Sequence, residues 1–488
     1  MKSKFLFSSI LFVLCLMLSC GDKGIEEPVP PKPEVPEVPK EPEEPEDPLP
    51  TTDTENWLYR QNKENGKKEK FFGIGTWHLP GYPLSETQIP ETEEAKQIYR
   101  EISANFNIIF LDPRYMKPHM AEKTQMISNF SNVIHGYLDK IAGLPKGTDK
   151  DYYRSQYLKA NVNSPEFVKL IEDNVDYLKS TYQNFDRIYA PIDEIAMGGV
   201  SKWFIPSTVG DLMYEIIKKK ETDPVVFVDL LGHGRGSTFF FEQNYLKEHS
   251  TMPGRPPYDL LSENARKQTT LPLLGFSQAY DGTTVYDFDS NGNYAYRNLS
   301  IGALKNIWFE NVKRIAEAYK NNGNVFSINA FRDFHASPVL AGVTVDAMKT
   351  GLGDKPIWLY FDGNGYAKPA SMTPKSYINS VKCQIYTSIV HGATGVFFWN
   401  DWSKTPEVFS DALLPMLKEL NEHLDIIYLP TIERKITEDL HVMIKQDSNG
   451  KKYIIAVNSN KTNTVTLGIQ GLQKTSLSPM EVYISPML

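Results

Sequence analysis

The sequence predicts an α/β fold, a closed (β/α)8 TIM barrel followed by a small antiparallel β domain. Three observations predict it. Short apolar runs rich in β-branched and aromatic residues recur eight times between residues 71 and 400, and longer amphipathic stretches separate them. After Pro430 the pattern changes to short alternating stretches with polar turns. Alternating strand and helix patterns indicate a parallel sheet, and eight strands suffice to fill a closed barrel with side chains.

The barrel elements follow one another along the chain. The eight expected strands are Phe71–Trp77, Asn107–Asp112, Arg187–Glu194, Val225–Leu231, Leu273–Ala279, Val325–Ala330, Ile357–Asp362 and Gly395–Asn400. The helical stretches between them include Ser164–Thr181, Ser207–Lys220, Ile301–Lys320, Pro338–Lys349, Lys375–His391 and Phe409–Ile427. Most of these stretches have capping residues or Gly/Pro breakers at their ends.

A doubly wound open sheet is the alternative fold. Such a sheet usually carries a glycine-rich phosphate turn after its first strand. The segment Gly73-Ile74-Gly75-Thr76-Trp77 has bulky side chains where a phosphate would approach, so close packing explains its glycines better.

The alternating pattern after Pro430 predicts a C-terminal module with short strands at Leu440–Lys445, Lys452–Asn458, Thr462–Gly468 and Met480–Ile484. A module of under about 60 residues is marginal by itself, so we expect it to pack against the barrel.

The N-terminus has the pattern of an export signal. Lys2 and Lys4 precede the apolar stretch Phe5–Leu18, which is shorter than the roughly 20 residues of a membrane span. The following Ser19-Cys20-Gly21 resembles the lipobox of bacterial lipoproteins. This resemblance implies that residues 1–19 are removed and that Cys20 carries the lipid; the alternative is an ordinary secreted protein.

Residues 20–53 form the expected linker. They are rich in proline and acidic residues and poor in bulky apolar ones, so they favour extended polyproline II of up to about 100 Å over a packed core. The domain boundaries that follow are a signal at 1–19, a lipidated linker at 20–53, a barrel at 54–430 and a β domain at 431–488.

Composition excludes several classes of function. The chain has 52 basic and 60 acidic side chains, a net charge of -8, so nucleic-acid binding is not expected. The 41% hydrophobic content does not fit a multi-span membrane protein, and three cysteines do not make a disulfide framework. The motifs GxSxG, CxxC, HExxH and the P-loop do not occur, so we expect no cofactor and no metal. The oligomeric state stays open.

Polar and aromatic residues gather where the expected strands end, which is where barrels of this type place their chemistry. The candidate substrate-binding residues are Trp77, His78, Asp112, Arg114, Asp229, Asn329, Trp399, Asn400, Asp401 and Trp402. Carboxylates, amides and indoles suit a sugar, because they move protons, pair with hydroxyls and stack on flat apolar faces. Each residue taken singly also has a structural interpretation, since Asp and Asn cap helices and indoles fill cores.

The acidic pair Asp193-Glu194 closes its strand and is the candidate catalytic pair. Burial and mutual repulsion raise the pKa of such neighbours, which suits a general acid near neutral pH. The construction resembles the TIM-barrel glycoside hydrolases of Bacteroidetes-type surface lipoproteins. The adjacent pair also resembles that of hexosaminidase-like families with substrate-assisted catalysis. The latter resemblance implies that Glu194 protonates the leaving oxygen and that Asp193 orients an acetamido group.

The second carboxylate has several candidates. Retaining barrels of the commonest clan place Asn-Glu after the fourth strand and a glutamate nucleophile after the seventh, whereas the expected strands place Asp-Glu after the third and Asp362 after the seventh. Either a strand is missing from the region 116–163 or the mechanism differs. With Asp362 or Asp401 as partner, a carboxyl separation of about 5–5.5 Å implies retention and about 6.5–9.5 Å inversion. Asp229 with Asp333 is a third pairing.

The sequence therefore predicts a glycoside hydrolase acting on a poly- or oligosaccharide by general acid/base catalysis. The alternative is a non-catalytic glycan-binding lipoprotein with a degenerate barrel. The lipoprotein resemblance implies export and a lipid anchor at Cys20, in the outer membrane of a Gram-negative bacterium and facing the cell exterior.

Overall fold

A computed structural model describes part of the chain, and these residues lie in one compact unit, Leu49–Leu488. The described residues are 55–61, 66–77, 101, 104–110, 123–144, 151–192, 205–230, 284–288, 294–298, 301–330, 334, 337–363, 372–399 and 412–487. The predicted signal, Cys20 and the linker up to residue 53 lie outside them.

Eight parallel strands form the barrel, in the order β10-β7-β6-β5-β4-β3-β12-β11. They are β3 Gly73–Thr76, β4 Ile108–Phe110, β5 Thr124–Ile127, β6 Arg187–Ile192, β7 Val225–Asp229, β10 Val325–Ser327, β11 Trp358–Asp362 and β12 Gly395–Trp399. Parallel bridges from Phe326 to Ile357 and from Asn329 to Tyr360 join the two outer strands, β10 and β11. The bridges close the sheet, so the predicted TIM barrel is confirmed.

The count of eight is right, but one member of the predicted set is wrong. Strand β5, Thr124–Ile127, lies between β4 and β6 and was not predicted. The predicted strand Leu273–Ala279 would lie between β7 and β10. These two strands instead pair directly with each other in the sheet. That segment itself lies outside the described residues. The acidic pair therefore follows the fourth strand, β6, and Asp362 ends the seventh, β11.

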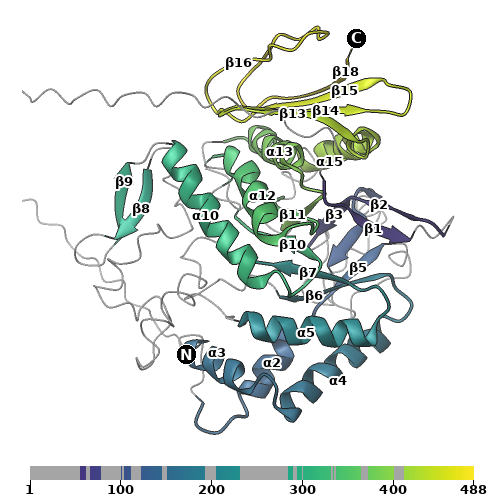
Figure 1. Ribbon diagram of the computed structural model, residues 1–488, viewed down its shortest axis with the longest axis vertical. Helices are drawn as coiled ribbons and strands as arrows, with labels where there is room; N and C mark the ends of the chain where they lie inside the picture. The colour runs from purple at the N-terminus through teal and green to yellow at the C-terminus, as the bar shows by residue number, and fades with distance from the viewer. Residues whose placement is uncertain are drawn as a thin grey trace, which may run out of the picture. The chain divides into compact units, whose positions relative to one another are not determined.

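Helices surround the barrel sheet, and successive ones pack against each other, α4 with α5 and α12 with both α10 and α13 (Figure 1). The helices are α2 Phe130–Leu138, α3 Asp151–Asn161, α4 Pro165–Thr181, α5 Ser207–Lys220, α10 Ile301–Tyr319, α12 Val339–Leu352, α13 Pro374–His391, α15 Leu414–Glu422 and α16 Leu424–Ile427. In the described part of the chain, none of them is both long and apolar enough to cross a membrane.

Helix α13 shows how local sequence sets the boundaries of a helix. The Thr373 side chain accepts a hydrogen bond from the Ser376 amide at 3.2 Å, and Pro374 occupies the first helical position, where no amide hydrogen is needed. Gly392 ends the helix with φ of 109°, a left-handed conformation that suits glycine.

Aromatic side chains fill the barrel interior. Phe227 of β7 lies 5.6 Å from Phe397 of β12 and 6.2 Å from Tyr360 of β11, measured between ring centroids. A Cβ atom on Gly75 of β3 would lie 2.2 Å from the Phe397 ring. Gly75 therefore makes room for the ring of its register partner on the neighbouring strand β12, in agreement with the close packing that the sequence predicts.

A four-stranded antiparallel sheet follows the barrel, as predicted, in the order β13-β14-β15-β18. Its strands are β13 Thr431–Ile436, β14 Leu440–Gln446, β15 Lys452–Asn458 and β18 Val482–Pro486. Strand β13 was not predicted. The predicted strand at 462–468 is present as the short β16 Val465–Thr466, which pairs antiparallel with β17 Ser476–Leu477 outside the four-stranded sheet. Two further hairpins precede helix α10: β1 Leu58–Gln61 with β2 Lys68–Phe71, and β8 Thr284–Phe288 with β9 Tyr294–Asn298.

A chain of hydrogen bonds links the C-terminal sheet to the barrel helices. Asp346 of α12 bonds His391 Nδ1 of α13 at 2.7 Å, His391 Nε2 bonds His441 Nδ1 of β14 at 2.9 Å, and His441 Nε2 bonds Ser459 Oγ at 2.8 Å. Both rings are buried. Burial is the main cause that lowers the pKa of His441 well below its ordinary value, and His391 lowers it further.

A buried ion cluster makes a second link to this sheet. Glu55, which precedes β1, bonds Arg434 of β13 and accepts a hydrogen bond from Thr431 at 2.6 Å. Lys445 of β14 lies 3.5 Å from the same carboxylate oxygen, and its side chain is 1% exposed. One buried carboxylate and two buried cations thus connect the start of the barrel unit to the C-terminal sheet.

Candidate active site

The carboxyl ends of the strands place two aspartates on the inner face of the barrel. Phe227 and Tyr360 belong to the interior aromatic cluster. Side chains two positions apart on a strand share a face, so Asp229 on β7 and Asp362 on β11 point inward at the next level toward the mouth. Both are buried, at 1% and 2% exposure.

The side chains beside Asp229 are polar. Ser327 of β10 is its partner in the parallel register. Asn329 follows Ser327 by two residues, is buried, and bridges to Tyr360 of β11. A carboxylate, a hydroxyl and an amide thus occupy neighbouring inward positions, where they have the hydrogen-bonding capacity that a polyhydroxylated ligand needs.

Asp362 is held by a helix that follows its own strand. Tyr377, in the first turn of α13, donates its hydroxyl hydrogen to Asp362 Oδ2 at 2.6 Å, and both groups are buried. A hydroxyl bonded to a carboxylate is a strong, charge-assisted hydrogen bond. It fixes the orientation of the carboxylate.

Two indoles continue the inner face beyond Asp362. Trp399 of β12 is the register partner of Asp362, and its carbonyl accepts a hydrogen bond from Gly363 at 3.1 Å. Trp77, next along the barrel after β3, stacks on Phe110 of β4 with centroids 3.8 Å apart and ring planes 7° apart. Both indoles are half-buried, so part of each is open to a ligand.

These observations place five predicted residues on one arc of the barrel mouth, from β7 through β10, β11 and β12 to β3. They are Asp229, Asn329, Asp362, Trp399 and Trp77. The other predicted site residues lie outside the described part of the chain and stay predictions. These are His78, Asp112, Arg114, Asp193, Glu194, Asn400, Asp401, Trp402 and the lipidation site Cys20.

The described part of β6 ends next to the acidic pair. The register with β7 shifts between Tyr189 and Ile192, which marks a bulge. A Cβ atom on Gly210 of α5 would lie 2.8 Å from Ile192 Cδ1, so the Ile192 side chain packs outward against that helix. The bulge therefore reverses the alternation of inward and outward side chains along β6 immediately before Asp193-Glu194.

Sequence reasoning missed Tyr377, Ser327 and Phe110. Ser327 precedes the predicted Asn329 by two residues, and Phe110 precedes the predicted Asp112 by two, so alternation along the strand could have found both. Tyr377 gave no local signal, because its role depends on where α13 begins relative to Asp362. In the described part of the chain, His, Cys, Asp and Glu side chains do not gather in threes that could hold a metal ion.

No protein family and no curated protein sequence matches this chain. Among solved structures, it is similar to the α-amylase from Geobacillus thermoleovorans complexed with acarbose, with 12% identity, a TM-score of 0.40, and coverage of 86% of this chain and 98% of that one. An endo-β1,6-glucanase has 9% identity, a TM-score of 0.33 and coverage of 86% and 81%. A family 51 α-L-arabinofuranosidase from Bifidobacterium longum has 9% identity, a TM-score of 0.35 and coverage of 90% and 93%.

These three neighbours are glycoside hydrolases. At such identities and TM-scores the likeness assigns neither an activity nor a site residue to this chain. The barrel is established by its own strand pairings.

Proposed function

We propose that this protein is a glycoside hydrolase in which Glu194 is the general acid and Asp362 is the second carboxylate. One observation carries the proposal. With β5 counted, the pair Asp193-Glu194 follows the fourth strand and Asp362 ends the seventh. Those are the two positions at which the commonest clan of glycosidase barrels keeps its acid and its nucleophile.

The residues differ from that clan's pattern at both positions. Asp193 stands where those barrels have asparagine, and Asp362 stands where they have glutamate. Aspartate is one methylene shorter than glutamate, so the carboxyl separation decides between a covalent intermediate and direct attack by water. The anomeric form of the first product, read by NMR, reports which of the two operates.

The described side chains supply the other parts of such a site. Tyr377 orients the Asp362 carboxylate. Asp229 and Asn329 offer acceptors and donors to sugar hydroxyls, and Trp399 and Trp77 offer partly open indole faces. This set has no surplus of positive charge, which favours an uncharged or weakly charged poly- or oligosaccharide.

Glu194→Gln tests the proposal. Removing a general acid lowers the rate by about 10²–10⁴-fold, so reducing-end release from a panel of host and plant glycans should fall by that amount. Glu215→Gln is the matched control, because Glu215 lies on α5 with its side chain 55% exposed. Turnover by the Glu194→Gln variant equal to that of the control would remove Glu194 from the mechanism. Binding of glycans by the wild type without any release would favour the non-catalytic alternative.

The place of action is a separate part of the proposal. We place the protein on the outer surface of a Gram-negative cell, tethered by a lipid at Cys20 and a spacer up to residue 53, on the sequence pattern described above. Labelling cells with a radioactive fatty acid tests this: the wild type should take up label, and Cys20→Ala should leave the membrane fraction. Equal labelling of both proteins would refute the anchor.

A further inference from the structure

A cavity lies at the opposite end of the barrel from the mouth, and we call it the basal cavity. It has a volume of about 600 Å³ and is lined by the β1–β2 hairpin, the start of β6 and the loop that enters β7. Small-molecule sites typically measure about 300–1,000 Å³, so the basal cavity is large enough for a ligand. The proposed hydrolysis makes no use of it.

The charges that line the basal cavity balance. Its three ion pairs are Arg60 with Asp186, Arg187 with Glu221 at 2.7 Å, and Lys68 with Asp223 at 2.5 Å. A charged ligand would have to compete with one member of a pair, and it would leave the other member without compensation. The cavity therefore suits a ligand that is polar and uncharged.

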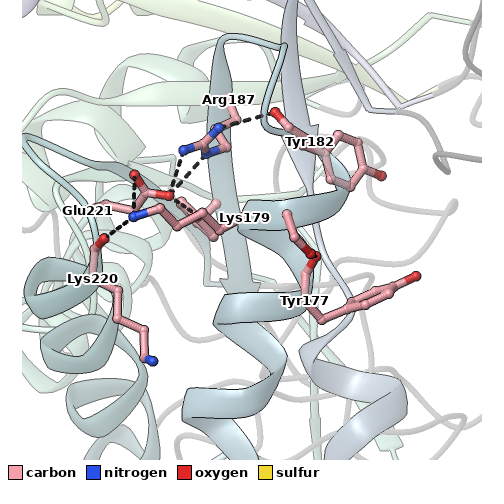
Figure 2. A network of polar contacts seen from close by, with 8 residues as sticks. Tyr177, Lys179, Tyr182, Arg187, Lys220 and Glu221 are labelled. Atoms are coloured by element: carbon pink, nitrogen blue, oxygen red, sulfur yellow. Dashed lines mark hydrogen bonds and ion pairs between the residues drawn. The ribbon is translucent and has the colours of Figure 1, made fainter.

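The carboxylate of Glu221 offers hydrogen-bonding capacity in this cavity. Its Oε1 accepts from Arg187 Nη2 at 2.7 Å and from the Tyr189 hydroxyl at 2.6 Å, whereas Lys179 Nζ stays 4.0 Å from Oε2 (Figure 2). Lys179 donates instead to the Lys220 carbonyl at 2.5 Å. Oε2 is therefore in a long ion pair with Lys179 and, among the described residues, accepts no hydrogen bond, so it has the capacity to accept one from a hydroxyl group.

An exposed aromatic ring lies at the edge of the basal cavity. Tyr59 of β1 lines the cavity and is 52% exposed. In the described part of the chain, its only counterpart among large exposed apolar side chains is Tyr177 of α4, which is 53% exposed and lies outside the lining. A tyrosine ring presents a flat apolar face and a polar tip, the combination that packs against a sugar ring.

We infer that the basal cavity binds a segment of neutral polysaccharide through Tyr59 and Glu221. This inference rests on the proposed function, because the ligand is of the same class as the proposed substrate. Arg187 lines the cavity and Ile192 ends the same strand near the mouth, a separation of about 17 Å along β6. The base and the mouth are thus at opposite ends of the barrel strands, and a polymer that reaches both can be held at the base and cut at the mouth.

Calorimetric titration of the full chain tests the inference. The background is Glu194→Gln with Trp399→Ala, which prevents cleavage and removes one indole from the mouth. The probes are xylo-, manno-, malto- and cello-oligosaccharides, with oligogalacturonides as charged comparators. We expect at least one neutral probe to bind, Tyr59→Ala to weaken it about tenfold, and Tyr59→Phe to keep most of the affinity. Tyr177→Ala is the matched control and should bind as the background does.

Three results would overturn the inference: equal affinity of the Tyr59→Ala and Tyr177→Ala variants, tighter binding of oligogalacturonides than of every neutral probe, or no binding of any neutral probe. Thermal melting of each variant shows that the fold is intact. The two proposals fail separately. Binding that depends on Tyr59, in a wild type that releases no reducing ends, refutes hydrolysis alone, and hydrolysis without any effect of Tyr59 refutes the basal site alone.

Discussion

Acidification should weaken the fold through His441, the histidine that joins the C-terminal sheet to the barrel. Burial, followed by the nearby His391 and Lys305, lowers its pKa well below the ordinary 6.5. The folded chain thus keeps His441 neutral at a pH where the unfolded chain binds a proton. This difference in proton binding does not lower the unfolding free energy above about pH 6.5. The unfolding free energy falls as the pH drops below that value toward the pKa of His441 in the folded chain.

The size of the effect follows from proton linkage. One pH unit below the ordinary histidine pKa, the unfolded state binds about 0.9 proton, and the loss of unfolding free energy reaches at most about 1.4 kcal/mol. The groups that face His441 are His391 at 2.9 Å and Ser459 at 2.8 Å, with Lys305 of α10 near. Asp346 bonds the far nitrogen of His391, so its carboxylate does not bond the ring that must take the proton.

Urea unfolding of the wild type and of His441→Gln, each at about pH 7.5 and pH 5.5, measures this term. Glutamine cannot reproduce the hydrogen bonds of the imidazole ring, so we expect a lower unfolding free energy at both pH values. Because glutamine does not titrate, we also expect a smaller difference in unfolding free energy between the two pH values. The change should be smaller than that of the wild type by up to about 1.4 kcal/mol. The contribution of His423, whose pKa burial also lowers, is common to both proteins and cancels. An identical pH dependence in the two proteins would refute the reasoning.

Two further predictions concern single hydrogen-bonded carboxylates. Tyr377→Phe removes the donor to Asp362 and should lower hydrolysis about ten- to hundredfold, because a hydrogen bond to a charged group contributes about 1.5–3 kcal/mol. Hydrolysis by the Tyr377→Phe variant at the wild-type rate would contradict this role of Tyr377. Glu55→Gln should lower the unfolding free energy by about 3–5 kcal/mol in urea titration, because it takes a carboxylate from the buried Lys445. The exposed Lys169→Ala should change nothing measurable, and equal losses would count against the buried cluster.

Most of the barrel could be predicted from sequence, because seven of its strands are apolar runs bounded by turn or cap residues. Strand β5 could not, since Thr124-Gln125-Met126-Ile127 is short and half polar. Gln125 is nevertheless fully buried, and its Nε2 donates to the Lys123 carbonyl at 3.2 Å. Pairing with β4 and β6 makes this segment a strand, and that information lies in its neighbours rather than in its own residues.

The candidate site was predictable where the strand itself carries the residue. Asp229, Asn329 and Asp362 were predicted because each is a polar residue at the carboxyl end of an apolar strand. Tyr377 and the basal cavity were not predictable. The first depends on the position of a helix after its strand, and the second on the β1–β2 hairpin, which the sequence pattern did not indicate.

Helix α13 connects the C-terminal sheet to Asp362, the proposed second carboxylate. Tyr377 in its first turn holds Asp362, and His391 in its last turn bonds His441 of the sheet. The helix is 18 residues long, about 27 Å, and packs against β11 on one side and against β14, β15 and β18 on the other (Figure 1). A carboxylate must be held within a fraction of an ångström to serve as a catalytic partner. In the proposed mechanism, the sheet contributes by fixing the far end of the helix that orients Asp362.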